Sequence, residues 1–364
     1  MPSAASSPSL VPSVPEAAGW SPSRAPRGGP VRVAVVGLGV LGRSVAAGVA
    51  RRRDLVLAGV VDADPALHGT TVELEGGERA TVAAALPAAG VDVVALLTTS
   101  RVEEVGALAL DLLGRGIDVI TAAEELTFPW RSHPEWSARL DAAGRAGGAS
   151  LLSVGANPGL LMETLPTVLS LATQRISSIA ISRTMDVRIH RPARLRRFGL
   201  GLTPEAFAAE PEEARHGHVG FRQSIDALAS ALDLPIDGVV QRPLSVAVIA
   251  DDERRGDHAV LAPGTVAVVE QRATAMASGR PLIELREHFG FVDPEDPVPH
   301  GDRWQIVGSE QRFVLDAPDG VHSFSTTPAT VVNMIGPLRD AAPGLRVIGE
   351  FPVRELASKG WRRG

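Results

Sequence analysis

Glu124 and Glu125 are adjacent carboxylates just past residues 117–120, a short apolar stretch with the pattern of a buried strand. Neighbouring residues of an extended segment point in opposite directions, so one glutamate can face a cleft while the other faces protein or solvent. A partly desolvated carboxylate in a cleft has a raised pKa and can exchange a proton near neutral pH. The competing interpretation is a loop carboxylate that accepts a hydrogen bond from a backbone N–H or pairs with an arginine.

Residues 37–42 read Gly-Leu-Gly-Val-Leu-Gly, a G-x-G-x-x-G motif between an apolar run at 31–36 and a helical pattern. The first glycine allows a tight turn, the second lets a pyrophosphate approach the backbone, and the third lets the helix pack closely on the strand. The helix N-terminus adds unpaired N–H groups and the positive end of its dipole. Although such a turn can also occur without a ligand, this context predicts a dinucleotide-binding turn made by Gly37, Gly39, Val40, Leu41 and Gly42.

Asp62 ends a second apolar run, residues 55–61, and lies 20 residues after Gly42. At this position an acidic side chain binds the ribose 2′-hydroxyl in dinucleotide-binding folds. The stretch Asp62-Ala63-Asp64-Pro65 contains no arginine. A 2′-phosphate would meet two carboxylates there and no guanidinium, so the cofactor is predicted to be NAD or NADP, with NAD favoured.

Three further polar stretches follow apolar strands: residues 98–100, 121–125 and 155–159. In a parallel sheet the carboxyl ends of the strands border the ligand cleft, so these stretches join the glycine turn in the candidate site. Asn157 begins an Asn-Pro-Gly turn, and its amide can either donate to a substrate or nicotinamide oxygen or hold its own turn. We expect Asn157 and Glu125 at the substrate, and at the cofactor Thr98, Thr99, Ser100 and Asn157.

His190, His216 and His218 are the other possible acid–base groups, although a lone histidine is more often packed or solvated than catalytic. Five arginines between Arg188 and Arg197 could bind a phosphate or carboxylate, form a solvated loop or meet an acidic partner surface. No cluster has convincing metal-ligand spacing, so no metal site is predicted.

The composition indicates a globular protein with room for two domains: 364 residues, 45% hydrophobic, with a net charge of −6 that argues against a nucleic-acid partner. No apolar run reaches the ~18 residues that span a bilayer, and no secretory signal is recognisable, so we expect a cytoplasmic protein without a membrane partner. Cysteine and tyrosine are absent and Lys359 is the single lysine. These absences exclude disulfides, a cysteine thioester and a Tyr-Lys proton relay.

The order of the elements predicts an α/β fold with a second, α+β domain. Residues 1–30, rich in Ser, Pro, Ala and Gly, predict a disordered leader. Residues 31–156 alternate strand and helix, the pattern of a Rossmann domain with a doubly wound parallel sheet. Residues 157–329 contain strands without intervening helices, which favours an open mixed sheet in a substrate and dimerisation domain. Residues 330–364 are expected to return to the Rossmann domain.

Within these domains the pattern predicts individual elements and one irregular basic segment at 188–201. Strands are expected at 31–36, 55–61, 91–97, 117–120, 149–154, 176–187, 244–250, 266–275, 282–289, 304–308, 312–315 and 345–351. Helices are expected at 80–89, 103–115, 134–147, 160–172, 217–234 and 328–338.

Five stretches together resemble the 2,4-diaminopentanoate dehydrogenase and native amine dehydrogenase family, which is related in fold to dihydrodipicolinate reductase. They are TAAEELTFPW (121–130), GANPGLLMETLP (155–166), GLGLTPEAF (199–207), GHVGFRQSIDALASAL (217–232) and VVNMIGPLRDAAPGL (331–345).

The resemblance implies NAD(P)-dependent oxidative deamination of an amine or diamino acid, or reductive amination of a ketone or aldehyde with ammonia, by a homodimer. It also implies that Glu124 is the catalytic carboxylate, which exchanges protons with ammonium and stabilises a cationic iminium. Asn157 would lie beside the nicotinamide. The alternatives are a carbonyl, sugar or semialdehyde oxidoreductase of the same fold and a non-catalytic NAD(P)-binding protein. The His-His and Lys constellation of dihydrodipicolinate reductase itself is missing.

Overall fold

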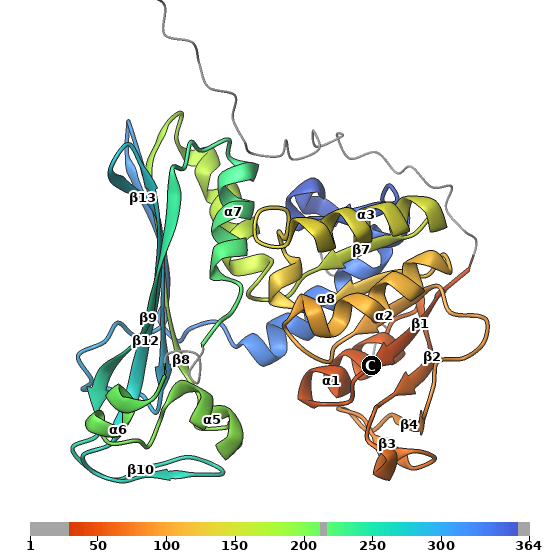
Figure 1. Ribbon diagram of the computed structural model, residues 1–364, viewed down its shortest axis with the longest axis horizontal. Helices are drawn as coiled ribbons and strands as arrows, with labels where there is room; N and C mark the ends of the chain where they lie inside the picture. The colour runs from red at the N-terminus through yellow and green to blue at the C-terminus, as the bar shows by residue number, and fades with distance from the viewer. Residues whose placement is uncertain (1–28, 212–216, 356–364) are drawn as a thin grey trace, which may run out of the picture.

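Two sheets dominate the computed structural model, which describes residues 29–211 and 217–355 (Figure 1). One is an eight-stranded, mostly parallel sheet with helices on both faces, and the other is a six-stranded mixed sheet. This confirms the predicted fold class. Most of the predicted leader, together with His216 and Lys359, lies outside the described residues.

The first sheet has the strand order β16-β7-β6-β5-β1-β2-β4-β3, with only β3 antiparallel to its neighbour. Its central strands are short and mostly apolar, as expected for strands covered on both faces. The strands are β1 (Val31–Val36), β2 (Leu55–Val61), β3 (Thr71–Glu73), β4 (Arg79–Ala83), β5 (Val93–Leu96), β6 (Asp118–Thr121), β7 (Ser150–Ser153) and β16 (Gly344–Arg346).

Two apolar layers hold helices against this sheet. The layer on one face contains side chains of α1 and α8, and the layer on the other contains side chains of α2 and α3. Arg339 of α8 donates to the buried carboxylate of Asp118 at 2.9 Å, which ties the late helix to β6. The helices are α1 (Val40–Ala50), α2 (Val102–Gly114), α3 (Pro134–Gly147) and α8 (Ser323–Asp340).

The second sheet has the order β15-β14-β8-β13-β12-β9, in which only β8 and β13 are parallel neighbours. One end of it packs against α7 (Phe221–Ala231) and the helical run that follows β7, and the other end carries α5 (Pro192–Phe198) and α6 (Pro204–Ala209) (Figure 1). Its strands are β8 (Ile176–Asp186), β9 (Gly238–Ile249), β12 (Val266–Ala277), β13 (Arg280–Gly290), β14 (Asp302–Gly308) and β15 (Arg312–Ala317), with a small separate ribbon of β10 (Arg254–Arg255) and β11 (Val260–Leu261).

The helices of this half are short. A continuous run of η3 (Leu160–Thr164), α4 (Leu165–Leu169) and η4 (Ser170–Ala172) confirms the helix predicted at 160–172. The others are α5 (Pro192–Phe198), α6 (Pro204–Ala209) and α7 (Phe221–Ala231). Single turns are η1 (Pro65–Leu67), η2 (Glu124–Leu126), η6 (Ile348–Glu350) and η7 (Val353–Glu355).

Three local predictions are wrong. The alanine-rich stretch 80–89 is not a helix: its first residues belong to β4, where Val82 is buried between exposed neighbours and pairs with β2. The basic segment 188–201 contains α5, because Leu195 and Phe198 bury one face of a short helix that begins at a proline. In the stretch 345–351 only the first two residues are in a strand, as part of β16, and the later residues form the single turn η6. The strand β16 pairs with β7 and so returns the chain to the first sheet.

Candidate active site

The glycine-rich turn has the geometry that its three glycines predict. Gly37 has φ +93°, and a Cβ there would lie 2.7 Å from the carbonyl oxygen of Leu97. A Cβ at Gly42 would overlap the carbonyl oxygen of Gly37, so this glycine allows α1 to start directly on the turn. At Gly39, by contrast, a Cβ would meet no atom of the described residues within 4 Å. The space above Gly39, at the N-terminus of α1, therefore fits the approach of a pyrophosphate.

Asp62 lies at the end of β2 beside this turn. Its carboxylate accepts hydrogen bonds from the backbone N–H of Leu38 at 2.7 Å and of Asp64 at 2.9 Å. These backbone donors lower the pKa of Asp62, so the side chain is an anion at neutral pH. Asp62 thus fixes the glycine turn and offers its remaining lone pairs to a neighbouring hydroxyl.

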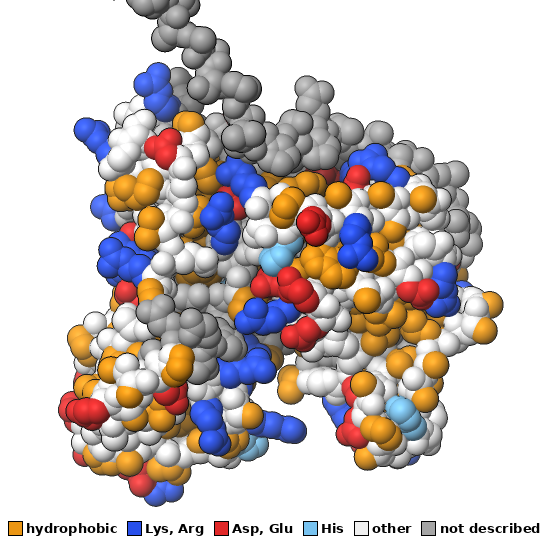
Figure 2. All heavy atoms as spheres, viewed as in Figure 1, with side chains coloured by type: hydrophobic (Ala, Val, Ile, Leu, Met, Phe, Trp, Pro, Cys, Tyr) orange, Lys and Arg blue, Asp and Glu red, His pale blue; other side chains and the backbone are white. Residues whose placement is uncertain are grey.

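A cavity of about 380 Å³ lies between the carboxyl edge of the first sheet and the second sheet. Figure 2 shows the molecule hollowed between these two parts, with basic side chains near the hollow. The half of the molecule built on the first sheet contributes Leu41 of α1 together with Ser100, Ala122, Glu124 and Asn157. The remaining lining comes from β8, α5, the start of α8 and the segments beside them, and from β13. It includes Met185, Phe198, Phe289, His322 and Phe324.

The other predicted cofactor residues lie around this cavity rather than in its lining. Val40 is 64% exposed at the first turn of α1. The methyl group of Thr98 packs close to Gly37, and the Thr99 hydroxyl accepts a long 3.5 Å hydrogen bond from the N–H of Arg101. Of the three polar residues after β5, only Ser100 lines the cavity.

Glu124 points into the cavity from the turn η2. Its Oε2 accepts a 2.7 Å hydrogen bond from the N–H of Val219 and lies 3.1 Å from Nδ1 of His218. The Glu124 side chain keeps 17% of its surface exposed. A carboxylate held by backbone from the other half of the molecule, yet open to the cavity, can exchange a proton with a small ligand.

Glu125 points away from the cavity, and we do not propose it as a substrate residue. Its Oε2 accepts a 2.9 Å hydrogen bond from the N–H of Val102, at the N-terminus of α2, and its Oε1 lies 3.8 Å from Arg101. It also forms the single group of three possible metal ligands in the described chain, with Glu103 and His133. Because the Glu125 carboxylate accepts a hydrogen bond at the N-terminus of α2, it stabilises the start of that helix.

Asn157 lines the cavity, but its amide nitrogen donates to another side chain of the protein. Nδ2 donates to Oε1 of the buried Glu287 at 2.6 Å, so this hydrogen does not face a ligand. The Asn157 Oδ1 is buried and has no hydrogen-bond partner in the described part of the chain. The free polar atom is thus the acceptor oxygen. Burial raises the pKa of Glu287, although Arg183 lies 3.5 Å away.

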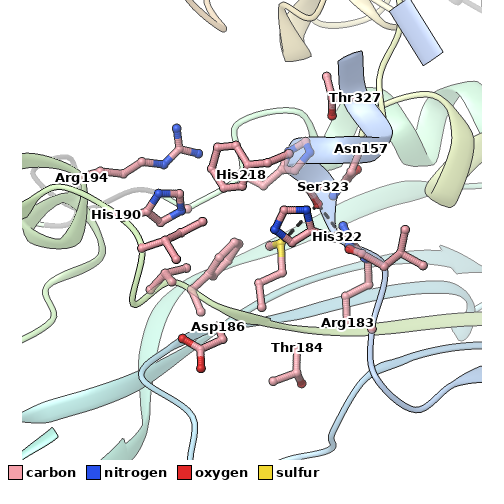
Figure 3. A pocket seen from close by; sticks show the side chains of 18 of the residues that line it. Asn157, Arg183, Thr184, Asp186, His190, Arg194, His218, His322, Ser323 and Thr327 are labelled. Carbon is pink, nitrogen blue, oxygen red and sulfur yellow. Dashed lines mark hydrogen bonds between the residues drawn. The ribbon is translucent and has the colours of Figure 1, made fainter. Parts of the chain in front are cut away.

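Several polar groups of the cavity had no clear signal in the sequence. Figure 3 shows that Arg183, His190, Arg194, His218 and His322 surround it from different elements. Burial, and then the nearby Arg194, lower the pKa of His190 to about 4, so this ring is neutral. Within the basic segment Arg188 pairs with Asp186 and Asp293, whereas Arg194 lines the cavity.

Comparison with known families gives the context of this site. The family model of the 2,4-diaminopentanoate dehydrogenase C-terminal domain matches residues 160–362. The chain belongs to the 2,4-diaminopentanoate dehydrogenase family. Accordingly it is an oxidoreductase, and the resemblance inferred from the five sequence stretches is confirmed.

Three further comparisons extend the likeness over nearly the whole length. The 2,4-diaminopentanoate dehydrogenase of Acetoanaerobium sticklandii is 27% identical over 334 residues, 89% of this chain and 94% of that protein. The solved amine dehydrogenase from Mycobacterium smegmatis superposes with a TM-score of 0.76 at 22% identity, covering 91% of this chain and 98% of that one. A probable dehydrogenase from Thermotoga maritima superposes more loosely, with a TM-score of 0.53 at 12% identity over 90% and 93% of the two chains. These structures show a shared fold.

None of the helices in residues 29–211 and 217–355 is long and apolar enough to cross a membrane.

Proposed function

We propose that this protein is a nicotinamide-dependent amine dehydrogenase, which aminates a ketone or aldehyde with ammonia or deaminates the corresponding amine. The observation that carries the proposal is Glu124, a carboxylate at the cavity wall between the glycine turn and the second sheet. The family membership and the names of the two relatives over the full length support the same chemistry.

The chain's own residues would bind the cofactor along the first sheet. The pyrophosphate would lie on the turn from Gly37 to Gly42, over the open position of Gly39, and a ribose hydroxyl would bind Asp62. The side chains of Leu41 and Ser100 would border the nicotinamide half, where the cavity begins. When bound, the cofactor supplies or accepts a hydride. Since Asp62 and Asp64 leave no site for a 2′-phosphate, we propose NAD as the preferred form.

Glu124 would carry the proton chemistry. Its carboxylate removes a proton from ammonium, and the free ammonia adds to the carbonyl carbon. The added nitrogen passes a second proton to the former carbonyl oxygen, which gives the carbinolamine. Glu124 then returns its own proton to that hydroxyl, which leaves as water, and the remaining iminium cation lies beside an ionised carboxylate. The unpartnered Oδ1 of Asn157 can accept a hydrogen bond from the amine nitrogen or from the nicotinamide carboxamide.

The body of the substrate would occupy the far part of the cavity. That part is mainly apolar, with Met185, Phe198, Phe289 and Phe324, and Arg194 is the cation among its lining residues that could meet an anionic group. A homodimer and a cytoplasmic location stay predictions. Light scattering of the purified protein tests the first, and fluorescence imaging of a tagged chain tests the second.

The test is a screen of NADH and NADPH oxidation at 340 nm with small ketones and aldehydes, each with and without excess ammonium. We expect oxidation that depends on ammonium and prefers NADH. Glu124→Gln should lower kcat by ~10²-fold or more while retaining NADH binding. Glu125→Gln is the matched control, because that carboxylate faces α2, and should keep kcat within about threefold.

Oxidation that does not require ammonium would identify a carbonyl oxidoreductase instead. Cofactor binding with no turnover on any carbonyl or amine of the panel would favour the non-catalytic alternative. A tenfold preference for NADPH would contradict the role of Asp62.

A further inference from the structure

His218 contacts Glu124 from the opposite half of the molecule. It lines the cavity, and its side chain is 6% exposed, with Nδ1 lying 3.1 Å from Oε2 of Glu124. The N–H of Gly220 also donates to this Nδ1, at 2.9 Å. The segment 218–220 therefore closes around one carboxylate oxygen, since Val219 between the two also donates to it.

Gln271 of β12 holds this segment in place. Its Oε1 accepts from the N–H of His218 and its Nε2 donates to the carbonyl oxygen of the same residue, both at 2.7 Å. A side chain that binds both backbone groups of one residue fixes the position of that residue strongly. The imidazole is thus pre-positioned on the carboxylate rather than placed there by chance contact.

The geometry requires a proton between the two side chains. An unprotonated Nδ1 and an ionised Oε2 are both acceptors, and two acceptors 3.1 Å apart repel each other. The contact is favourable when Oε2 or Nδ1 carries a proton. The Gly220 N–H favours an unprotonated Nδ1, whereas the carboxylate favours a protonated one, so the two placements of the proton compete.

The other titratable groups near His218 leave Glu124 as its exchange partner. Glu163 on η3 and Glu287 on β13 both interact electrostatically with His218, but burial raises the pKa of each, which favours their neutral forms. Arg183 on β8, the cation beside Glu287, donates to Asp302 at 3.1 Å and lies 3.5 Å from Glu287. The His218 Nε2 is buried without a partner in the residues that the structure describes.

We propose that His218 is the proton partner of Glu124 in amine formation, a role that rests on the proposed function. An N–H bond of ammonium breaks and its proton passes to Oε2 of Glu124 and on to Nδ1 of His218, giving an imidazolium and a carboxylate. The proton later returns through Glu124 to the oxygen of the carbinolamine, which leaves as water. No electrons are exchanged in these steps. His218 acts through Glu124 and is therefore a positioning and proton-holding residue.

The decisive variant is His218→Asn, since the Asn amide occupies the place of Nδ1 and hydrogen-bonds to Glu124 but cannot take up a proton. We expect kcat for ammonium-dependent NADH oxidation to fall ~10²-fold, with KM for the carbonyl changed less than about threefold, and one titration to vanish from the pH profile of kcat. The same substitution at the exposed His258 should leave both unchanged. An Asn variant with the parent's kcat and pH profile would show that His218 only holds Glu124, and would overturn the proposal.

A second measurement does not depend on turnover. The Nδ1 signal of His218 is identified in NMR spectra of ¹⁵N-histidine-labelled protein by its loss in His218→Asn, and is then compared in the parent and in Glu124→Gln. Loss of the carboxylate should move this signal toward the position of an unprotonated nitrogen, because the acceptor of the shared proton is gone. An unchanged Nδ1 signal would overturn the proton partnership. If the parent turns over no substrate but the Nδ1 signal moves, the proposed reaction fails while the partnership stands.

Discussion

Gly220 packs against both members of the Glu124–His218 pair, which makes Gly220→Ala a sharp test of the site geometry. A Cβ at this position would lie 2.9 Å from Cβ of Glu124 and 2.9 Å from Cε1 of His218. Ordinary carbon contacts are ~3.5–4.0 Å, so the two side chains must move by roughly 0.5–1 Å. The backbone of Gly220, with φ −93° and ψ 10°, is open to alanine, so the strain falls on the pair.

A displacement of about 1 Å in a positioned catalytic group costs ~10²-fold in rate, or about 2.7 kcal/mol of transition-state stabilisation. We therefore expect Gly220→Ala to lower kcat for ammonium-dependent NADH oxidation by that factor. The dissociation constant of NADH, measured by calorimetry, should stay within about twofold, because the three nearest atoms to a Cβ at Gly220 belong to Glu124 and His218 and none to the glycine turn. Activity is measured at 340 nm with saturating carbonyl and ammonium.

Gly114→Ala is the matched control, because a Cβ at Gly114 meets no described atom within 4 Å and lies at the end of a helix. This variant should be as active as the parent and slightly more stable. If Gly220→Ala keeps kcat within threefold of the parent, the close contact between the turn 218–220 and Glu124 does not position the reacting group, and the reasoning fails.

Three further predictions follow from other parts of the fold. Gly39→Ala should raise the dissociation constant of NADH at least tenfold without lowering the melting temperature of the free protein, since its Cβ enters open space that only the pyrophosphate would fill. Arg339→Met removes the ion pair that Arg339 makes with the buried Asp118 and should cost about 3–5 kcal/mol in urea unfolding, against about 0–1 kcal/mol for the exposed Arg303→Met. His190, whose pKa is about 4 when folded against 6.5 in the free side chain, takes up its proton more readily in the unfolded chain. The parent should therefore lose stability as the pH falls from about 6.5 to 4, and His190→Phe should lose less, as melting curves at several pH values will show.

The glycine turn and its sheet could be predicted from sequence because their signals are local. Gly37, Gly42 and the apolar strands around them act on residues that lie within a few positions or in the next strand. The same logic places the pair Glu124 and Glu125 at the site, because they follow a parallel strand, and the family resemblance then selects Glu124. The stretch 80–89 shows the limit of that approach. Its alanines favour a helix, but its first residues form a strand because they pair with β2.

The orientation of the site groups depends on residues too far apart in sequence for pattern reasoning. Val219 and His218 reach Glu124 across 95 and 94 positions, and Glu287 reaches Asn157 across 130. The sequence leaves the Asn157 amide either donating to a ligand or holding its own turn, and only the second sheet reveals that a buried carboxyl group accepts one of its hydrogens. The packing of the two sheets determines which of these groups meet. Hydrophobic periodicity and secondary-structure propensity carry no information about that packing.

One feature of the sequence nevertheless points to His218: glycines lie close on both sides of it, in Gly217-His218-Val219-Gly220. A Cβ at Gly217 would collide with the side chain of Gln271, and a Cβ at Gly220 would collide with Glu124 and with the His218 ring itself. Neither glycine has a positive φ that would explain it by backbone conformation. Both are therefore required by close approach: one lets Gln271 fix the histidine backbone and the other lets the ring reach the carboxylate. A histidine between two such glycines indicates a buried, positioned imidazole, and this is the physical reason to look for its proton partner.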